Sequence, residues 1–191
     1  TTSELAVITQ AGHEVAPLIL PQVRDDLDAA AIEPTVLDLL GANPALRRRA
    51  RAELASRPEA DRFGAVTAVE LAAQGIVDGP VAAHAEMALR AALTTRTPAG
   101  PGTRWHAVSA GIAVLLLGGT APAAEIRAHV DHLLRRIRDL SSGRFRCVAG
   151  IGSGVAGLER AAESAAQARL ARRAAATVLG TPVAAWDELG P

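Results

Sequence analysis

The order of apolar segments between residues 63 and 186 constrains the fold of this chain more than any other feature of its sequence. Short apolar runs of strand length alternate with longer stretches whose apolar residues recur every three or four positions. The strands are expected at residues 63–71, 105–109, 112–117, 145–151 and 182–186, and the helices at 78–95, 122–140 and 158–178. This order, β-α-β-β-α-β-α-β, predicts an α/β (α+β) fold. Its inner β-α-β-β-α-β unit has the ferredoxin-like arrangement, a sheet backed by helices on one face.

A helical segment is expected to precede this sheet. Helices are predicted at residues 5–28 (two short ones, or one that is kinked), 33–40 and 44–56. The last of these begins with an Asn43 cap followed by Pro44, a residue that fits the first helical position. We therefore expect residues 1–58 to form a helical lead or connector, and residues 59–190 to form the sheet domain.

Composition and charge exclude several classes of protein. Hydrophobic residues make up 49% of the chain but aromatic residues only 2%, so the core must consist mainly of Ala, Val, Leu and Ile. A formal net charge of zero gives no overall attraction to nucleic acid or an anionic membrane. No apolar run approaches the roughly 20 residues needed to span a bilayer, and nothing at the N-terminus of this sequence resembles a signal peptide. We expect a cytoplasmic protein, and arginine without any lysine suggests a GC-rich bacterial genome.

Residues 152–157 form a literal G-x-G-x-x-G between a predicted strand and a predicted helix. In a dinucleotide-binding fold these glycines would bring the backbone close to a pyrophosphate at the helix N-terminus. Such a fold also needs a second strand that ends in an acidic residue about 20 residues further on. A long helix occupies that interval here, so we interpret the motif as a glycine-rich turn and expect no cofactor.

The pair His129 and His132 lies on one face of a predicted helix, at a spacing that could hold a metal. No matching set of Cys or carboxylate ligands is apparent elsewhere, so a solvated helix face is the preferred interpretation. Cys147 is the only cysteine, which excludes an internal disulfide, and it reads as a small core residue. For nucleophilic catalysis, no Ser or Cys is accompanied by a His and an acidic residue in a pattern that suggests a catalytic triad. We therefore predict no catalytic, cofactor-binding or metal-ligating residues.

Four arginines gather in the lead segment, at Arg47, Arg48, Arg49 and Arg51. Consecutive positions point all round a helix, and no aromatic residues interleave to stack on bases. A solvated or interdomain face is the preferred interpretation, with a partner contact as the alternative.

Three stretches between residues 112 and 190 carry a family resemblance. The first is residues 112–118, a strand followed by a helix with proline in its first turn. The second is residues 148–153, a strand that ends in G-x-G. The third is the helix with Ser164 and Gln167, together with the closing residues 183–190. In this order they resemble the GGDEF-like regulatory domain of PucR/CdaR-type bacterial transcription regulators, with Gln167 where an acidic residue is more usual.

The resemblance implies a regulatory domain that lies between an N-terminal sensory region and a C-terminal helix-turn-helix. The chain would be a middle fragment that relays a signal and forms a homodimer. It would reach DNA only through a helix-turn-helix located after Pro191. The effector is unknown, and no membrane contact is expected. Residues 1–58 would be the link from the sensory region.

Diguanylate cyclases share this architecture and need carboxylates to hold the divalent metals that act on the triphosphate. Their G-G-[DE]-E-F turn would fall at residues 108–112, which contain no acid. Their metal aspartate would fall near Glu70, and a lone carboxylate is a poor metal site. The domain is therefore expected to be degenerate and not an enzyme.

Two alternatives remain open. One is a nucleotidyl cyclase or nucleotide hydrolase with an atypical metal site at Glu70. The other is a protein-interaction module without a small ligand. The alanine-rich faces of the helices at residues 78–95 and 158–178 could pack on the sheet or across a dimer interface.

Overall fold

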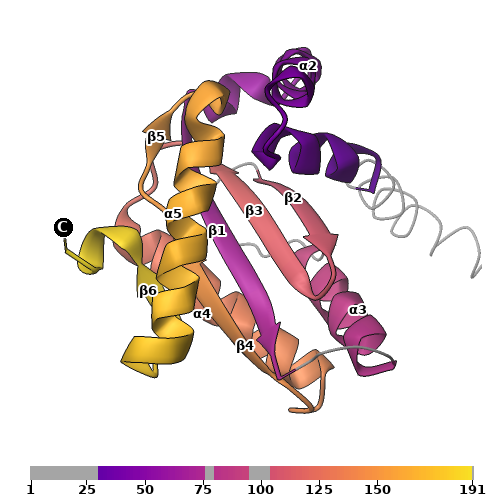
Figure 1. Cartoon of the computed structure of the whole chain (residues 1–191), viewed down its shortest axis with the longest axis vertical. Coiled ribbons are helices and arrows are strands. Elements are labelled where there is room, and N and C mark those ends of the chain that lie inside the picture. Colours follow the sequence, from indigo (N-terminus) through magenta and orange to yellow (C-terminus); the bar gives the residue numbers. More distant parts are fainter. Residues whose placement is uncertain (1–29, 76–79, 95–103, 191) are drawn as a thin grey trace, which may run out of the picture. The chain divides into compact units, whose positions relative to one another are not determined.

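A computed structural model of the chain describes residues 30–75, 80–94 and 104–190 (Figure 1). The chain divides into two compact units, Thr1–Ala31 and Ile32–Pro191. The helices expected at residues 5–28 lie outside the described residues. Within the described ranges, no helix is long and apolar enough to cross a membrane.

The second unit is built on a sheet whose strand order is β2-β3-β1-β4-β6, with β5 paired to β1. The strands are β1 (Ala65–Gln74), β2 (Arg104–Ser109), β3 (Ile112–Gly118), β4 (Arg146–Ile151), β5 (Val155–Ala156) and β6 (Val183–Ala185). Strand β1 lies antiparallel between β3 and β4, and β6 is parallel to β4. The α+β class and the ferredoxin-like order β2-β3-β1-β4 are thus confirmed. The two-residue β5 was not expected.

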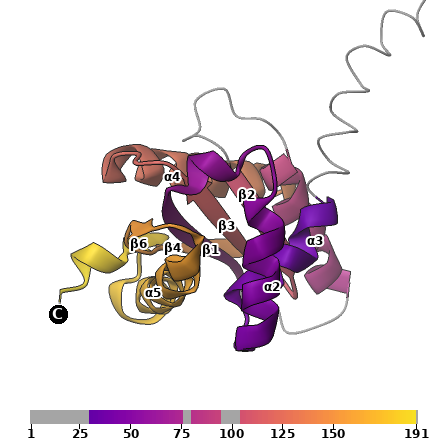
Figure 2. The ribbon, with the colours of Figure 1, turned by 90° about the horizontal axis from the view of Figure 1, so that it is seen from above.

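Helices cover both faces of this sheet, as Figure 2 shows from above. They are α2 (Pro44–Ala55), α3 (Pro80–Thr94), α4 (Ala123–Leu140) and α5 (Ala161–Ala174), and residues 32–40 are also helical. The alternation of side chains along β1 defines the two sides. Val69 and Leu71 belong to the core under α3 and α4, whereas Val66 and Ala68 belong to the core under α5. The inner unit has its two helices on one face, as predicted, and α5 covers the other.

The lead segment from residue 32 onward is part of the compact unit. Val36 and Leu54 are fully buried in the same core as Phe63, and the ring of Phe63 stacks on Trp105 with ring centroids 3.8 Å apart. The division expected between residues 58 and 59 therefore does not separate the compact units. The apolar faces of these helices complete the core on the α5 side of the sheet, which a free connector would leave exposed.

Local signals explain most of the element boundaries. Asn43 caps α2, since its side-chain oxygen accepts a hydrogen bond of 2.9 Å from the amide of Ala45. Ala110 and Gly111 both have positive φ, at 50° and 72°, which is the geometry of a tight two-residue hairpin between β2 and β3. The helix predicted at residues 158–178 is observed as a 3₁₀ turn (Leu158–Arg160), α5 and a π-helical turn (Ala175–Leu179).

Candidate functional site

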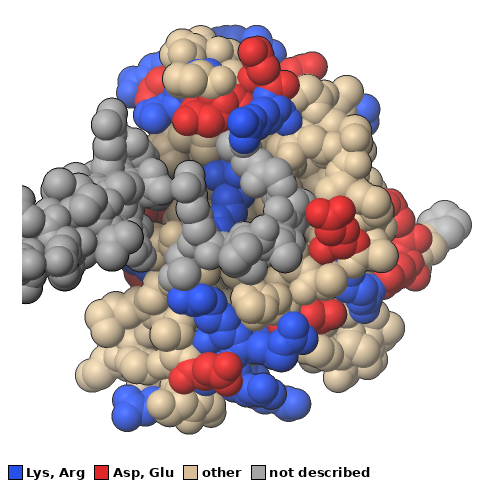
Figure 3. All heavy atoms as spheres, turned by 180° about the vertical axis from the view of Figure 1, so that it is seen from behind, with Lys and Arg blue, Asp and Glu red and all other residues tan. Residues whose placement is uncertain are grey.

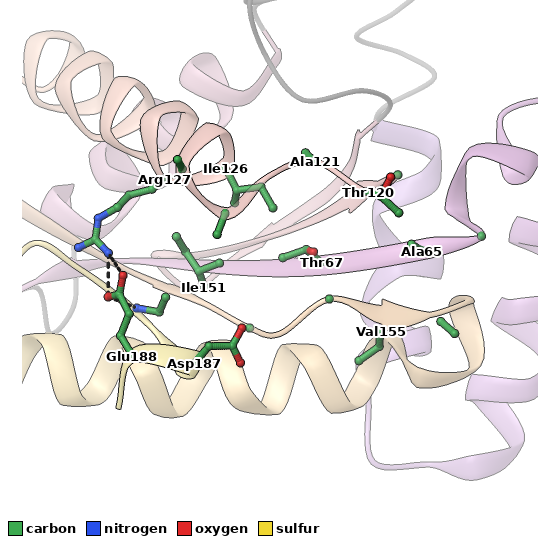
Figure 4. A pocket seen from close by; sticks show the side chains of 18 residues that line it. Ala65, Thr67, Thr120, Ala121, Ile126, Arg127, Ile151, Val155, Asp187 and Glu188 are labelled. Atoms are coloured by element: carbon green, nitrogen blue, oxygen red, sulfur yellow. Dashed lines mark hydrogen bonds and ion pairs between the residues drawn. The ribbon is translucent and has the colours of Figure 1, made fainter. Parts of the chain in front are cut away.

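A groove of about 720 Å³ lies between the start of α4 and the start of β1 (Figure 4). The ends of β3, β4 and β6 also line it. Its walls are mostly small or apolar and include Ala65, Ala121, Ile126, Ile151 and Val155. Its polar lining residues are Thr67, Thr120, Arg127, Asp187 and Glu188. None of these residues could be nominated as a site from the sequence, because they come from four separate stretches of the chain that only the fold brings together.

The charged side chains of the groove form hydrogen bonds with one another or with a neighbouring residue. Arg127 donates to both carboxylate oxygens of Glu188, at 2.5 and 2.8 Å, and Figure 4 shows this pair at one end of the groove. These hydrogen bonds hold the pKa of Glu188 below its usual value. Asp187 accepts a hydrogen bond of 2.5 Å from the hydroxyl of Ser153. This end of the groove is therefore anionic overall, with two acids facing one arginine.

The glycines of the G-x-G-x-x-G motif, together with Gly150 just before it, serve close packing and backbone geometry. A Cβ atom on Gly152 would lie 2.1 Å from the carbonyl oxygen of Ser164, and one on Gly150 would lie 2.0 Å from that of Ala168. Helix α5 thus lies directly on β4. Gly157 has a φ of 68°, which favours glycine. Only Gly154 is unconstrained in these terms, since its Cβ would meet nothing closer than Thr67 Oγ1 at 3.5 Å.

Two polar residues of α5 fasten this contact. The Ser164 side chain is fully buried; its hydroxyl accepts from the amide of Ala68 at 2.9 Å and donates to the carbonyl of Ser153 at 2.7 Å. Gln167 accepts a hydrogen bond of 3.0 Å from the amide of Ser153. Ser164 and Gln167 are two of the residues on which the family resemblance rests, and in this chain they hold the turn after β4 against α5.

Glu70, the residue closest to the cyclase metal position, lies in the middle of β1 opposite Val114 and Gly150. It is only 1% exposed, and its carboxylate pairs with Arg172 at 2.8 Å and Arg169 at 3.2 Å. Both arginines come from α5. A carboxylate engaged in this way fastens the helix to the sheet, and two cations beside it oppose the approach of a metal ion.

The alanine-rich faces of α3 and α5 pack within the chain itself. Ala85, Ala88 and Ala92 of α3 are at most 5% exposed, and Ala165 and Ala168 of α5 are at most 3% exposed. The outward side of α3 instead presents Val81 and Met87, whose exposed fractions are 49% and 63%. Of the two roles considered for the alanines, the structure shows the packing role.

The two histidines of α4 have different environments. His129 is 4% exposed, and neither of its ring nitrogens has a hydrogen-bond partner among the described residues, whereas His132 is half-buried. Burial, together with the positive charges of Arg104 and His132, lowers the pKa of His129 to about 4. In the part of the chain that the structure describes, no group of three or more His, Cys, Asp or Glu could hold a metal. The preferred interpretation, a solvated face, is wrong for His129, because α4 turns it into the core.

The buried His129 predicts a loss of stability in acid. Its pKa in the folded chain is about 4, below the ordinary histidine value of 6.5, so the unfolded state binds the proton more tightly. Stability is expected to fall as the pH drops from 6.5 toward 4, by on the order of 1 to 2 kcal/mol at pH 5. Urea unfolding of the wild-type chain and of His129→Leu at pH 7 and pH 5 measures this difference.

His129→Leu is expected to lose less stability than the wild type between the two pH values, and to be at least as stable at pH 7, since two unpaired polar atoms are removed. The matched control is His132→Asn, which is expected to keep the acid sensitivity. An equal pH response in the wild type and His129→Leu would contradict the prediction.

Cys147 is an unreactive thiol. Burial raises its pKa to about 12, against the smaller opposing effect of backbone hydrogen bonds with Ala72 and with Val148, whose carbonyl oxygen lies 3.9 Å from the sulfur. A thiol that stays protonated at neutral pH is a poor nucleophile. The side chain is half-buried and packs against the core under α3 and α4, so the prediction of a core residue is confirmed in part.

The arginine run lies on α2. Arg48, Arg49 and Arg51 are exposed and Arg47 is half-buried. The end of the molecule that carries α2 shows acidic as well as basic side chains in Figure 3, so its charge is mixed. A mixed face agrees with the preferred interpretation of a solvated surface.

A polar junction joins the helix at residues 32–40 to α3 and to the edge strand β2. Glu33 accepts a hydrogen bond of 2.6 Å from the backbone amide of Val108, and Arg90 pairs with both of its oxygens. Arg90 also donates to the carbonyl of Val108 at 2.9 Å and to Glu86 at 3.1 Å. Desolvation raises the pKa of Glu33, but the hydrogen bonds from Arg90 and Val108 outweigh it and leave the pKa below the usual value.

Searches for related proteins give no assignment: no family model matches the chain, and no curated protein matches it.

Proposed function

We propose that this chain is the regulatory domain of a bacterial transcription regulator of the PucR/CdaR type, which relays a signal and associates as a homodimer in the cytoplasm. DNA would be contacted through a separate helix-turn-helix domain. The observation that carries the proposal is the junction at Glu33. One carboxylate binds the helix that enters the compact unit to both α3 and the edge strand β2.

The junction supports a relay because its partners belong to different elements. Arg90 lies on α3, and Val108 lies on β2 next to the hairpin. A displacement of the entering helix would break the hydrogen bond to the Val108 amide and the ion pair with Arg90 at the same time, while Arg90 would keep its hydrogen bonds to Glu86 and to the Val108 carbonyl. Such a coupled change is what a conformational relay requires.

The environment of Glu70 favours this proposal over the cyclase alternative. Its carboxylate is buried and shared by Arg169 and Arg172, and residues 108–112 of the hairpin carry no acid. For self-association, the exposed Val81 and Met87 on α3 offer apolar surface. The buried alanines do not, since the chain itself covers them.

The proposal is tested in the organism that carries the gene. Deletion of the gene is expected to change a defined set of transcripts, and Glu33→Ala, at an unchanged protein level, is expected to change the same set. Glu53→Ala is the matched control, because Glu53 bonds Thr35 within the lead segment and does not reach α3 or β2. Unchanged transcripts after deletion, or Mg²⁺-dependent turnover of GTP by the purified chain, would overturn the proposal.

A further inference from the structure

Helix α4 begins at the groove without a side-chain cap. Its N-cap residue is Pro122, which offers no side-chain hydrogen bond. The first amides of a helix have no partner inside the helix, and they form the positive end of its dipole. The amides of Ala123 and Ala124, two residues that line the groove, have no acceptor among the described residues. An uncapped helix start is not by itself a binding site.

Thr67 supplies a second, independent observation. It is only 6% exposed, lines the same groove, and its hydroxyl has no hydrogen-bond partner among the described residues (Figure 4). Its neighbours on the same face of β1, Val69 and Leu71, are apolar core residues. Its oxygen is not among the fully enclosed side-chain atoms that lack a partner, so the hydroxyl reaches the groove. Valine has the same shape without the polar atom, so a threonine on this otherwise apolar face points to a ligand in the groove.

The charges of the groove restrict what this ligand can be. Hydrogen-bond donors lie at the start of α4 and at Thr67, so the bound group is an acceptor. At the other end, Arg127 is already paired with Glu188, and Asp187 adds a further negative charge. Two acids facing one arginine oppose a polyanion such as a nucleoside triphosphate more strongly than a ligand with a single negative charge, because the repulsion grows with the charge of the ligand. The remaining walls are alanine, glycine, isoleucine and valine, which suit an apolar body.

We propose that this groove binds a small organic carboxylate. The two carboxylate oxygens would accept hydrogen bonds from the amides of Ala123 and Ala124 and from the hydroxyl of Thr67. The apolar part of the ligand would lie against the alanine and isoleucine walls. This site does not depend on a role in transcription, and it would stand if the proposed function failed.

The experiment is an NMR titration of the ¹⁵N-labelled 191-residue chain with sodium propionate. Sodium chloride at equal ionic strength and inorganic phosphate are titrated in parallel. Propionate is expected to cause saturable shifts at the amides of Thr67, Ala123 and Ala124. Shifts no larger than those with chloride would overturn the proposal, as would tighter binding of phosphate than of propionate.

Two variants sharpen the test. Thr67→Val removes the hydroxyl and is expected to weaken propionate binding about tenfold, while Thr67→Ser restores it. Ala123→Pro removes one amide and is compatible with the helix start, because Pro122 already has a ψ of 144°. Ala123→Pro is expected to weaken propionate binding and to leave the midpoint of thermal unfolding unchanged. Equal affinity of Thr67→Val and the wild type would overturn the assignment of Thr67.

Discussion

Gly152→Ala is expected to lower the free energy of unfolding by about 3 kcal/mol or to prevent folding, whereas Gly154→Ala changes it by less than about 0.5 kcal/mol. The added Cβ at Gly152 would lie 2.1 Å from the carbonyl oxygen of Ser164, and neither backbone can move without parting β4 from α5. At Gly154 the nearest atom would be Thr67 Oγ1, at an ordinary 3.5 Å. Urea unfolding followed by circular dichroism measures both.

The comparison separates the two interpretations of the G-x-G-x-x-G motif, since both substitutions alter it equally. If the glycines served a phosphate, the two variants would fold alike and differ only in ligand binding. Similar stability of Gly152→Ala and Gly154→Ala would therefore contradict the packing role of Gly152.

Glu70→Ala is expected to lower the free energy of unfolding by about 3 kcal/mol. The substitution leaves the guanidinium group of Arg172, whose side chain is 14% exposed, without its carboxylate partner. Replacing both residues, as in Glu70→Leu with Arg172→Leu, is expected to recover part of the loss, because the unpaired buried charge of Arg172 is removed and the remaining cation, Arg169, has a side chain that is 51% exposed. The test is urea unfolding of Glu70→Leu, of Arg172→Leu and of the variant that carries both substitutions, beside Glu70→Ala.

This result bears on the cyclase alternative. A destabilised Glu70→Ala chain would lose any activity, whether or not Glu70 touched a substrate, so turnover must be compared at equal folded fractions. Glu70→Ala with wild-type stability and with abolished Mg²⁺-dependent GTP turnover would contradict the structural role and support a metal site.

The sheet and its helices could be predicted from the sequence because each element carries its own signal. The apolar repeat of α4 and the Ala110-Gly111 turn are local patterns, and so is the Asn43 cap. Strand β5 could not be predicted, since two residues hold no periodicity. The burial of His129 was missed because His129 borders the apolar stripe of α4. The sequence does not fix the rotation of the helix about its axis, and that rotation decides which border of the stripe faces the core.

The candidate sites could not be predicted, because they join residues that are distant in sequence. Glu33 meets Arg90 across 57 positions and Val108 across 75. The groove combines the start of β1 with the start of α4 and with Asp187 near the end of the chain. The glycine motif could be interpreted as structural, but the reason, the direct contact of α5 with β4, depends on the tertiary fold.

One of the two tryptophans of the chain lies in the core that the lead segment completes, and the other lies next to the groove. Trp105 is buried against Phe63, in the core that the lead segment completes, and Trp186 directly precedes the groove residue Asp187. With no tyrosine in the sequence, these two indoles supply nearly all of the near-ultraviolet signal. In a variant that keeps only Trp105, the fluorescence reports on the packing of the lead segment against the core. In a variant that keeps only Trp186, it reports on changes at the groove. Intrinsic fluorescence can therefore follow the two events separately without an added label.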